Sequence, residues 1–203
     1  MEDGKSVLNM KVCVGQGRNM KNQNTLEHFD DTARADKPFP RETPILNSLI
    51  HSVEVNPIWN IPRSIATKEI IVEAAEDRYY LSNKNIDVFK DGKRIEDPET
   101  IDWSQVTPDN LEYEFKQRPG EDNSLGKIKF LFKNRSSVYL HDTPNKEAFR
   151  HAMRAVSHGC VRLGDPLGLA QNLFGEGAAL DTISKDMVED KPNPTNIGLP
   201  KKT

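Results

Sequence analysis

The sequence predicts a mainly β domain with a few helices, an α+β fold whose mixed sheets form a sandwich or an open barrel. Apolar and charged residues alternate strictly over residues 111–116, which is the period of a half-buried strand. Three more segments rich in β-forming residues, 5–15, 127–133 and 137–141, are also predicted as strands. With 203 residues the chain is long enough for one sizeable core, so we expect one active site.

A small α/β insertion is predicted to interrupt this domain. Two prolines in residues 57–62 forbid a regular helix and mark a rigid connection at its start. Thr67 is expected to cap a helix that runs to about residue 75, and Asp91-Gly92 predicts the turn of a hairpin over residues 86–96. The predicted units are a main domain formed by residues 1–60 and 111–203 and a capping subdomain formed by residues 61–110.

Two further helices are predicted downstream. Thr143-Pro144 is expected to start one that carries apolar residues as far as Val156, and Asp165-Pro166 to start another that stops at Gly175. Cys160 would then lie in the connection between two helices. Residues 190–203 are rich in proline, lysine and asparagine, and we expect a linker or an unfinished sheet edge there.

The start of the chain also carries a turn signal. Asp3-Gly4 is typical of a hairpin turn, but only two residues precede it, so we expect that the first strand of this hairpin is absent from the chain. Residues 16–44 are polar without periodicity and are expected to form a long exposed loop.

Composition excludes several classes of function. Charged residues make up 29% of the chain and the formal net charge is −3, so nothing predicts a nucleic-acid-binding face. No apolar run approaches the ~20 residues that a membrane span needs. The residues after Met1 do not resemble a signal peptide.

The two cysteines lie in different settings. Cys13, between two valines, is expected to be a small buried side chain of a strand. Cys160 follows Gly159 in a polar, loop-like stretch that ends in an arginine, Arg162. Two cysteines do not indicate a disulfide framework. Because only Cys160 lies in a polar, loop-like setting, it is the candidate for chemistry.

The run Ser157-His158-Gly159-Cys160-Val161-Arg162 offers what acyl transfer through a thioester needs. A thiol of ordinary pKa is mostly protonated at neutral pH, so an imidazole must reach the sulfur. His141, His158 and His151 are the candidates, and His141 has the advantage of ending a strand, which would hold its ring rigidly. Gly159 permits unusual dihedral angles, so the amides of Gly159 and Cys160 are expected to face a developing oxyanion.

A histidine followed by Ser-His-Gly-Cys-Val-Arg resembles the signature of L,D-transpeptidase catalytic domains, with His141 and residues 157–162 at the matching positions. The resemblance covers most of the chain from about Lys5 and points to the large periplasmic branch with a capping subdomain, so the expected fold is a mixed β-sandwich of that type. Its further motifs are Val55-Asn56-Pro57-Ile58-Trp59-Asn60-Ile61-Pro62, Arg118-Pro119-Gly120, Asn123-Ser124-Leu125-Gly126 and Tyr139-Leu140-His141-Asp142-Thr143-Pro144. Members of this branch carry further strands at both ends, so the chain is expected to be truncated.

This resemblance implies an activity. Cys160 would attack the carbonyl of the third residue of a peptidoglycan tetrapeptide stem, and His141 would act as base and then as acid. An amine of a neighbouring stem would resolve the thioester and leave a 3→3 cross-link. The predicted cap would exclude water from the cleft. The location implied is the periplasm, and carbapenem β-lactams are the inhibitors implied.

The resemblance also implies roles for the neighbouring residues. Arg162 would organise the motif or meet a substrate carboxylate, and Asp142 would orient the ring of His141 through its carbonyl or its side chain. The remaining expected substrate-site residues are Ser157, His158 and Tyr139. Neither a metal nor an organic cofactor is implied.

Three alternatives stay open at this point. A cysteine peptidase or L,D-carboxypeptidase would use the same thiolate and imidazole and let water resolve the thioester. A metal site of Cys160, His158 and His141 would lack the four-ligand spacing of structural zinc. A non-catalytic module that binds the cell wall is the third alternative.

Overall fold

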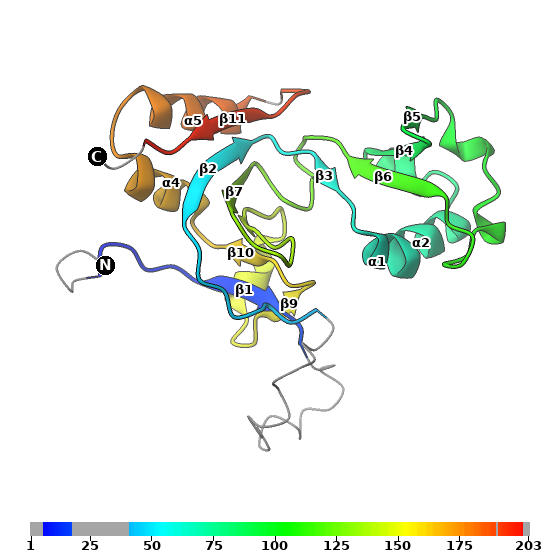
Figure 1. The fold of residues 1–203 in the computed structure, drawn as a ribbon, viewed down its shortest axis with the longest axis horizontal. Coiled ribbons are helices and arrows are strands. Elements are labelled where there is room, and N and C mark those ends of the chain that lie inside the picture. The colour runs from blue at the N-terminus through cyan, green and yellow to red at the C-terminus, as the bar shows by residue number, and fades with distance from the viewer. Residues whose placement is uncertain (1–5, 18–40, 190, 201–203) are drawn as a thin grey trace, which may run out of the picture.

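The structure is a computed structural model that describes residues 6–17, 41–189 and 191–200. It is mostly β-sheet with a few helices, so the predicted α+β class with mixed sheets is confirmed. Its strands form one seven-stranded and one four-stranded sheet (Figure 1). No pairing among the described strands joins the two ends of either sheet, so the open-barrel alternative is wrong.

The larger sheet has the strand order β11-β2-β7-β8-β10-β1-β9. Two of its pairings, β8 with β10 and β1 with β9, are parallel, and the other pairings are antiparallel. The strands are β1 (Val12–Gly15), β2 (Ile50–Val55), β7 (Ile128–Phe132), β8 (Leu140–His141), β9 (Ala155–Ser157), β10 (Val161–Leu163) and β11 (Thr195–Gly198).

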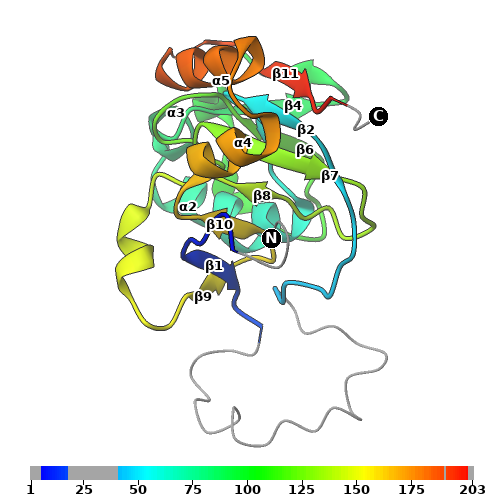
Figure 2. The ribbon, with the colours of Figure 1, turned by 90° about the vertical axis from the view of Figure 1, so that its left-hand side faces the viewer.

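The two faces of this sheet differ because successive side chains point to opposite sides. One face is apolar and packs against α4 (Pro166–Phe174) and α5 (Ala178–Val188), which lie together on one side of the sheet (Figure 2). The buried residues of this cluster are Val53, Val55, Ile128, Phe130 and Leu163 from the sheet, Ala170 from α4 and Ile183 from α5. The other face is polar, and four of its residues pair in register across four strands: Glu54, Lys129, His141 and Arg162.

Residues 59–117 build the smaller sheet, and we call this segment the cap. Its strand order is β3 (Trp59–Asn60), β6 (Tyr113–Gln117), β4 (Ile86–Lys90) and β5 (Lys93–Arg94). The cap has its own apolar cluster, to which β6 contributes Phe115 and the adjoining helices contribute Ile65, Ile70 and Ile71. Short helical elements complete it: α3 (Tyr80–Asn83), η4 (Pro98–Thr100) and η5 (Trp103–Gln105). The domain boundaries predicted at 61 and 110 stay a prediction.

The hairpin of the cap follows the prediction. Strands β4 and β5 pair through a turn in which Asp91 and Gly92 both have positive φ, 51° and 73°. Two positive φ angles define the type I′ turn, whose twist matches that of the flanking strands.

The helix of the cap begins earlier than predicted. It runs from Arg63 as α1 (Arg63–Ile65), a π-helical turn η3 (Ala66–Ile70) and α2 (Ile71–Glu76). Pro62 precedes the first helical residue, and its fixed φ suits that position. Thr67 lies inside the helix, where its hydroxyl donates to the carbonyl of Arg63 at 2.9 Å, so the predicted cap at Thr67 is wrong.

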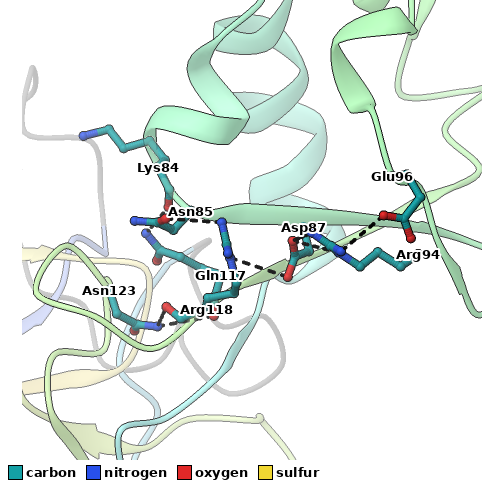
Figure 3. A network of polar contacts seen from close by, with 8 residues as sticks. All are labelled: Lys84, Asn85, Asp87, Arg94, Glu96, Gln117, Arg118 and Asn123. Atoms are coloured by element: carbon teal, nitrogen blue, oxygen red, sulfur yellow. Dashed lines mark hydrogen bonds and ion pairs between the residues drawn. The ribbon is translucent and has the colours of Figure 1, made fainter. Parts of the chain in front are cut away.

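Two side-chain amides hold the segments that connect the cap to the larger sheet (Figure 3). The buried Asn123 Nδ2 donates to the carbonyls of Pro57, Gln117 and Arg118, and so joins both points at which the chain crosses between the sheets. Gln117 Nε2 donates to the carbonyls of Lys84 and Asp122. Because each amide satisfies several carbonyls of irregular backbone, this junction is expected to be stiff.

The helix predicted from residue 144 to Val156 is wrong. A 3-10 turn, η6 (Lys146–Arg150), is followed by extended chain and by β9. This segment pairs with the edge of β1 instead of forming a helix. Val14 N–H donates to the carbonyl of Arg154, and Arg154 Nε donates to the carbonyl of Val12. Cys160 therefore lies between two strands and not between two helices.

Asp165 caps α4, which ends at Gly175, as predicted. For residues 190–203 a linker or an unfinished sheet edge was predicted, and of the two the edge fits: β11 is the end strand of the larger sheet and pairs with β2 through its backbone. An edge strand of this kind needs no apolar pattern, which is why the composition did not reveal it. The predicted turn at Asp3-Gly4 lies outside the described residues.

Replacing Asn123 by alanine is expected to lower the free energy of unfolding by about 3 kcal/mol, because three buried carbonyls lose their donor. Chemical denaturation measures this change. Asn172→Ala on the exposed face of α4 is the control and should stay within about 0.5 kcal/mol of the parent. Equal stabilities of the two variants would mean that the junction does not depend on this amide.

Candidate active site

The six-residue motif forms a turn between β9 and β10, which we call the motif turn (residues 157–162). Ser157 is buried and its hydroxyl closes the turn, donating to the carbonyl of Cys160 and accepting from the N–H of Gly159 at 3.1 Å. Gly159 has φ +126°, a conformation that residues with a side chain rarely adopt. The sequence therefore requires serine and glycine here to shape the backbone around the cysteine.

Thr43 fastens the motif turn to β1. Its hydroxyl accepts from Gly15 N–H and donates to the carbonyl of Gly159, both at 2.8 Å. A side chain at Gly15 would overlap the backbone of residues 41–43, so the glycine permits this close approach. The sequence did not predict a role for Thr43, which lies near the end of the polar segment 16–44 that has no periodicity.

Cys160 is half-buried, and it lies next to the point at which β8 begins. Burial raises the pKa of its thiol above the ordinary value, and a hydrogen bond from the backbone of Tyr139 and the charge of Arg162 act in the opposite direction. Among the described residues its own backbone N–H has no acceptor.

His141 ends β8 and is buried. Its Nδ1 bonds to the carbonyl oxygen of Asp142, and because a carbonyl can only accept, Nδ1 carries the proton. Burial lowers the pKa of the ring to about 4, while backbone hydrogen bonds to Asp142 and Leu125 partly offset that burial. The imidazole is therefore neutral at physiological pH.

Strand pairing brings His141 and Cys160 to the same part of the sheet. In the parallel ladder of β8 and β10, His141 pairs with Arg162 and Leu140 with Val161. Cys160 precedes this ladder, on the side of Tyr139, whose carbonyl accepts from Val161 N–H at 3.0 Å. Within the described residues the ring of His141 makes no hydrogen bond to the Cys160 sulfur, and the two pKa shifts leave a thiol and a neutral imidazole at rest.

The other two candidate histidines point elsewhere. His151 is exposed after η6. His158 Nε2 lies 2.7 Å from Glu69 Oε1 of the cap, and the same oxygen accepts from Arg41 Nη2 at 2.7 Å. Neither Arg41 nor Glu69 was predicted, because only the tertiary fold brings them to the motif turn.

The carbonyl of Asp142 holds the His141 ring, as one of the two predicted options, while its side chain has structural partners. The buried carboxylate accepts from Lys127 N–H at 3.0 Å and from the ammonium of Lys146. It also packs against Gly126, where a side chain would overlap it. The side chain of Asp142 therefore has a structural role: it holds residues 126–127 and Lys146 next to the segment that carries His141.

Arg162 has a buried hydrogen-bond donor, Nε, that has no partner within the described part of the chain. Its guanidinium acts to lower the pKa values of Cys160 and Cys13. A buried cationic donor without an acceptor is suited to bind a carboxylate.

A buried ion pair beside the site was not predicted. Lys129 Nζ lies 2.8 Å from Glu54 Oε1, with only 11% and 14% of the two side chains exposed. Lys129 also lies 5.5 Å from the ring centre of Tyr139. Burial raises the pKa of the Tyr139 hydroxyl, and the charges of Cys160 and Glu54 raise it further. Tyr139 thus lines the polar face between the ion pair and the cysteine.

The structure gives the metal alternative no support from geometry. In residues 6–17, 41–189 and 191–200 no three side chains of His, Cys, Asp or Glu are grouped as metal ligands. None of the helices described is long and apolar enough to cross a membrane.

Comparisons with known proteins agree with this geometry. Residues 1–177 match the sequence model of the L,D-transpeptidase catalytic domain (YkuD). Over 151 residues the chain is 32% identical to a Haemophilus influenzae protein named "Putative L,D-transpeptidase". The match covers 74% of this chain and 30% of that protein. The matched region thus accounts for less than a third of the relative's length.

The neutral resting pair predicts the pH profile of thiol alkylation. Because the pKa of Cys160 is raised, its alkylation by iodoacetamide should increase with pH, with a midpoint above that of a cysteine peptide in the same buffer. Peptide mapping by mass spectrometry separates Cys160 from Cys13. A plateau that begins below pH 7 and disappears in His141→Ala would instead establish a preformed ion pair.

Proposed function

The chain belongs to the L,D-transpeptidase catalytic-domain family, and on that premise we propose that it joins peptidoglycan stem peptides in 3→3 cross-links, with Cys160 as nucleophile. The observation that carries the proposal is the pairing of β8 with β10, in which His141 lies opposite Arg162, two residues after Cys160 in the same segment. Family membership supports a transferase that acts on peptidoglycan peptides. The cysteine mechanism and the type of cross-link are our proposal.

In the first step, Cys160 Sγ attacks the carbonyl carbon of the third residue of a tetrapeptide stem. Since both groups are neutral at rest, the thiol proton passes to Nε2 of His141 as the C–S bond forms, while Nδ1–H stays bonded to the Asp142 carbonyl. Collapse of the tetrahedral intermediate breaks the C–N bond to the terminal D-alanine. The imidazolium returns its proton to the leaving amine.

The Cys160 backbone N–H is the better candidate for the oxyanion. It has no acceptor among the described residues, whereas the N–H of Gly159 donates to Ser157 Oγ. We therefore assign the oxyanion contact to Cys160 and give Gly159 the role of shaping the turn through its positive φ. A Gly159 N–H contact would require the Ser157 hydrogen bond to open.

Substrate recognition is assigned to the polar face around the nucleophile. The unpartnered Nε of Arg162 is placed for a stem-peptide carboxylate, and Tyr139 lines the wall beside Cys160. Ser157 and His158 act through the shape of the motif turn. Carbapenems are the proposed inhibitors, because they present a strained acyl group together with a carboxylate.

In the second step, an amine of a neighbouring stem attacks the thioester carbonyl. Neutral His141 accepts the proton of this amine, the C–S bond breaks, and the sulfur leaves as the thiol after protonation. Water is the competing nucleophile, and we propose that the cap limits its access. The proposed place of action is the periplasm, in line with a family that acts on the cell wall.

Product analysis tests the function. With a disaccharide tetrapeptide, the parent should release D-alanine and form a 3→3 cross-linked dimer, both quantified by liquid chromatography and mass spectrometry. Cys160→Ala should form neither product, and His141→Ala should be slower by a factor of about 100 to 10,000. Release of D-alanine without dimer would make the protein a carboxypeptidase, and full activity of Cys160→Ala would refute the mechanism.

A further inference from the structure

Glu69 is the acidic residue through which the cap meets the motif turn. It lies in the π-helical turn η3, whose buried residues, Ala66 and Ile70, face the core of the cap. A π-helical turn changes the direction in which the following side chains point, and such turns are frequent at functional sites. Glu69 thus points away from the core of the cap and toward another part of the chain.

One oxygen of Glu69 joins three segments that are far apart in sequence. Oε1 lies 2.7 Å from Arg41 Nη2 and 2.7 Å from His158 Nε2. A carboxylate only accepts hydrogen bonds, so His158 Nε2 must carry a proton, in the neutral or in the charged ring. Arg41 Nη1 also donates to Gln16 Oε1 at 3.3 Å, which links this contact to the end of β1.

The contact lies two residues from the nucleophile. His158 precedes Gly159, whose carbonyl is held by Thr43, in the same segment as Arg41. The motif turn therefore has a fixed side, bonded to Thr43 and β1, and a side that is bonded to the cap through His158. If the end of the cap that carries Glu69 moved, His158 would move first, followed by the turn that carries Cys160.

The exposure of the three side chains suits a contact that opens and closes. Arg41, Glu69 and His158 keep 31%, 40% and 30% of their side-chain surface exposed. Ion pairs with this much exposure contribute little to global stability. The other end of the cap is held by the buried amides of Asn123 and Gln117, so loss of the Glu69 contact would leave the cap folded and attached.

We propose that Glu69 is a positioning residue that docks the cap onto the motif turn through His158, and that this contact directs the acyl-enzyme toward an amine and away from water. The proposal rests on the thioester mechanism proposed above. In the docked state the cap shields the thioester and holds the turn. In the undocked state water reaches the same carbonyl, and the thioester is hydrolysed to the free acid and the thiol.

The test compares Glu69→Ala, His158→Ala and the double variant with the parent. Glu73→Ala is the matched control, an exposed acidic residue four positions further along the same helix. Two quantities are measured in each protein: the ratio of hydrolysed to cross-linked product for equal amounts of Cys160 adduct, and hydrogen exchange in residues 63–76 and 157–162.

Both single variants should raise the ratio of hydrolysis to transfer by about fivefold and speed exchange in both segments, and the double variant should resemble each single one. Glu73→Ala should match the parent. Unchanged exchange in Glu69→Ala would refute the docking contact, and faster exchange with an unchanged ratio would refute its effect on the acyl-enzyme. Loss of the Cys160 adduct itself would assign Glu69 to acylation and also overturn the proposal. The adduct on the parent reports separately on the thioester mechanism.

Discussion

Parallel pairing of β8 with β10 is the constraint on which the candidate site depends. It joins segments about twenty residues apart in sequence and sets His141 opposite Arg162, so the thiol of Cys160 comes beside the strand that carries the imidazole. Side chains of both strands share one face because the pleat alternates. The opposite face is filled by apolar packing against α4 and α5, so a shift of register by one residue would turn His141 into the core and bury a polar ring against Phe130.

Burial determines the protonation states of the two candidate catalytic groups, His141 and Cys160. The same packing that holds His141 rigidly lowers its pKa to about 4, and the pKa of Cys160 is raised. Both shifts disfavour charge, so proton transfer would accompany attack on the substrate instead of preceding it. Fixed dipoles complete the arrangement, with the Asp142 carbonyl behind the ring and the Cys160 amide free to face a developing oxyanion. A backbone hydrogen bond from Tyr139 and the positive charge of Arg162 favour the thiolate, but burial outweighs both.

Local signals predicted much of this fold, whereas contacts between distant segments lay beyond them. Alternation over residues 111–116 and the Asp91-Gly92 turn depend on neighbouring residues, and both were read correctly. The helix expected up to Val156 is wrong because the edge of β1 pairs with that segment, and the sequence left a linker and a sheet edge as alternatives at β11 because its pairing is made by the backbone. The motif made Cys160 and His141 the candidates, but no local pattern indicates that Thr43 and Glu69 contact residues 158–159 or that Glu54 pairs with Lys129. The contacts of these residues form only when the folded sheet brings distant loops together.

The contact between the cap and the motif turn is partly exposed, whereas the junction at Asn123 is buried, and on this difference rests our proposal that the cap covers the site and can open. The claim at the centre of this account is that Cys160 carries the acyl group. Rapid acid quenching after mixing with a tetrapeptide donor and no acceptor, followed by peptide mapping, measures it directly. A tripeptide acyl mass is expected on the Cys160 peptide, and it should form more slowly in His141→Ala. An unmodified Cys160 while D-alanine is being released, or an acyl group on another residue, would contradict it.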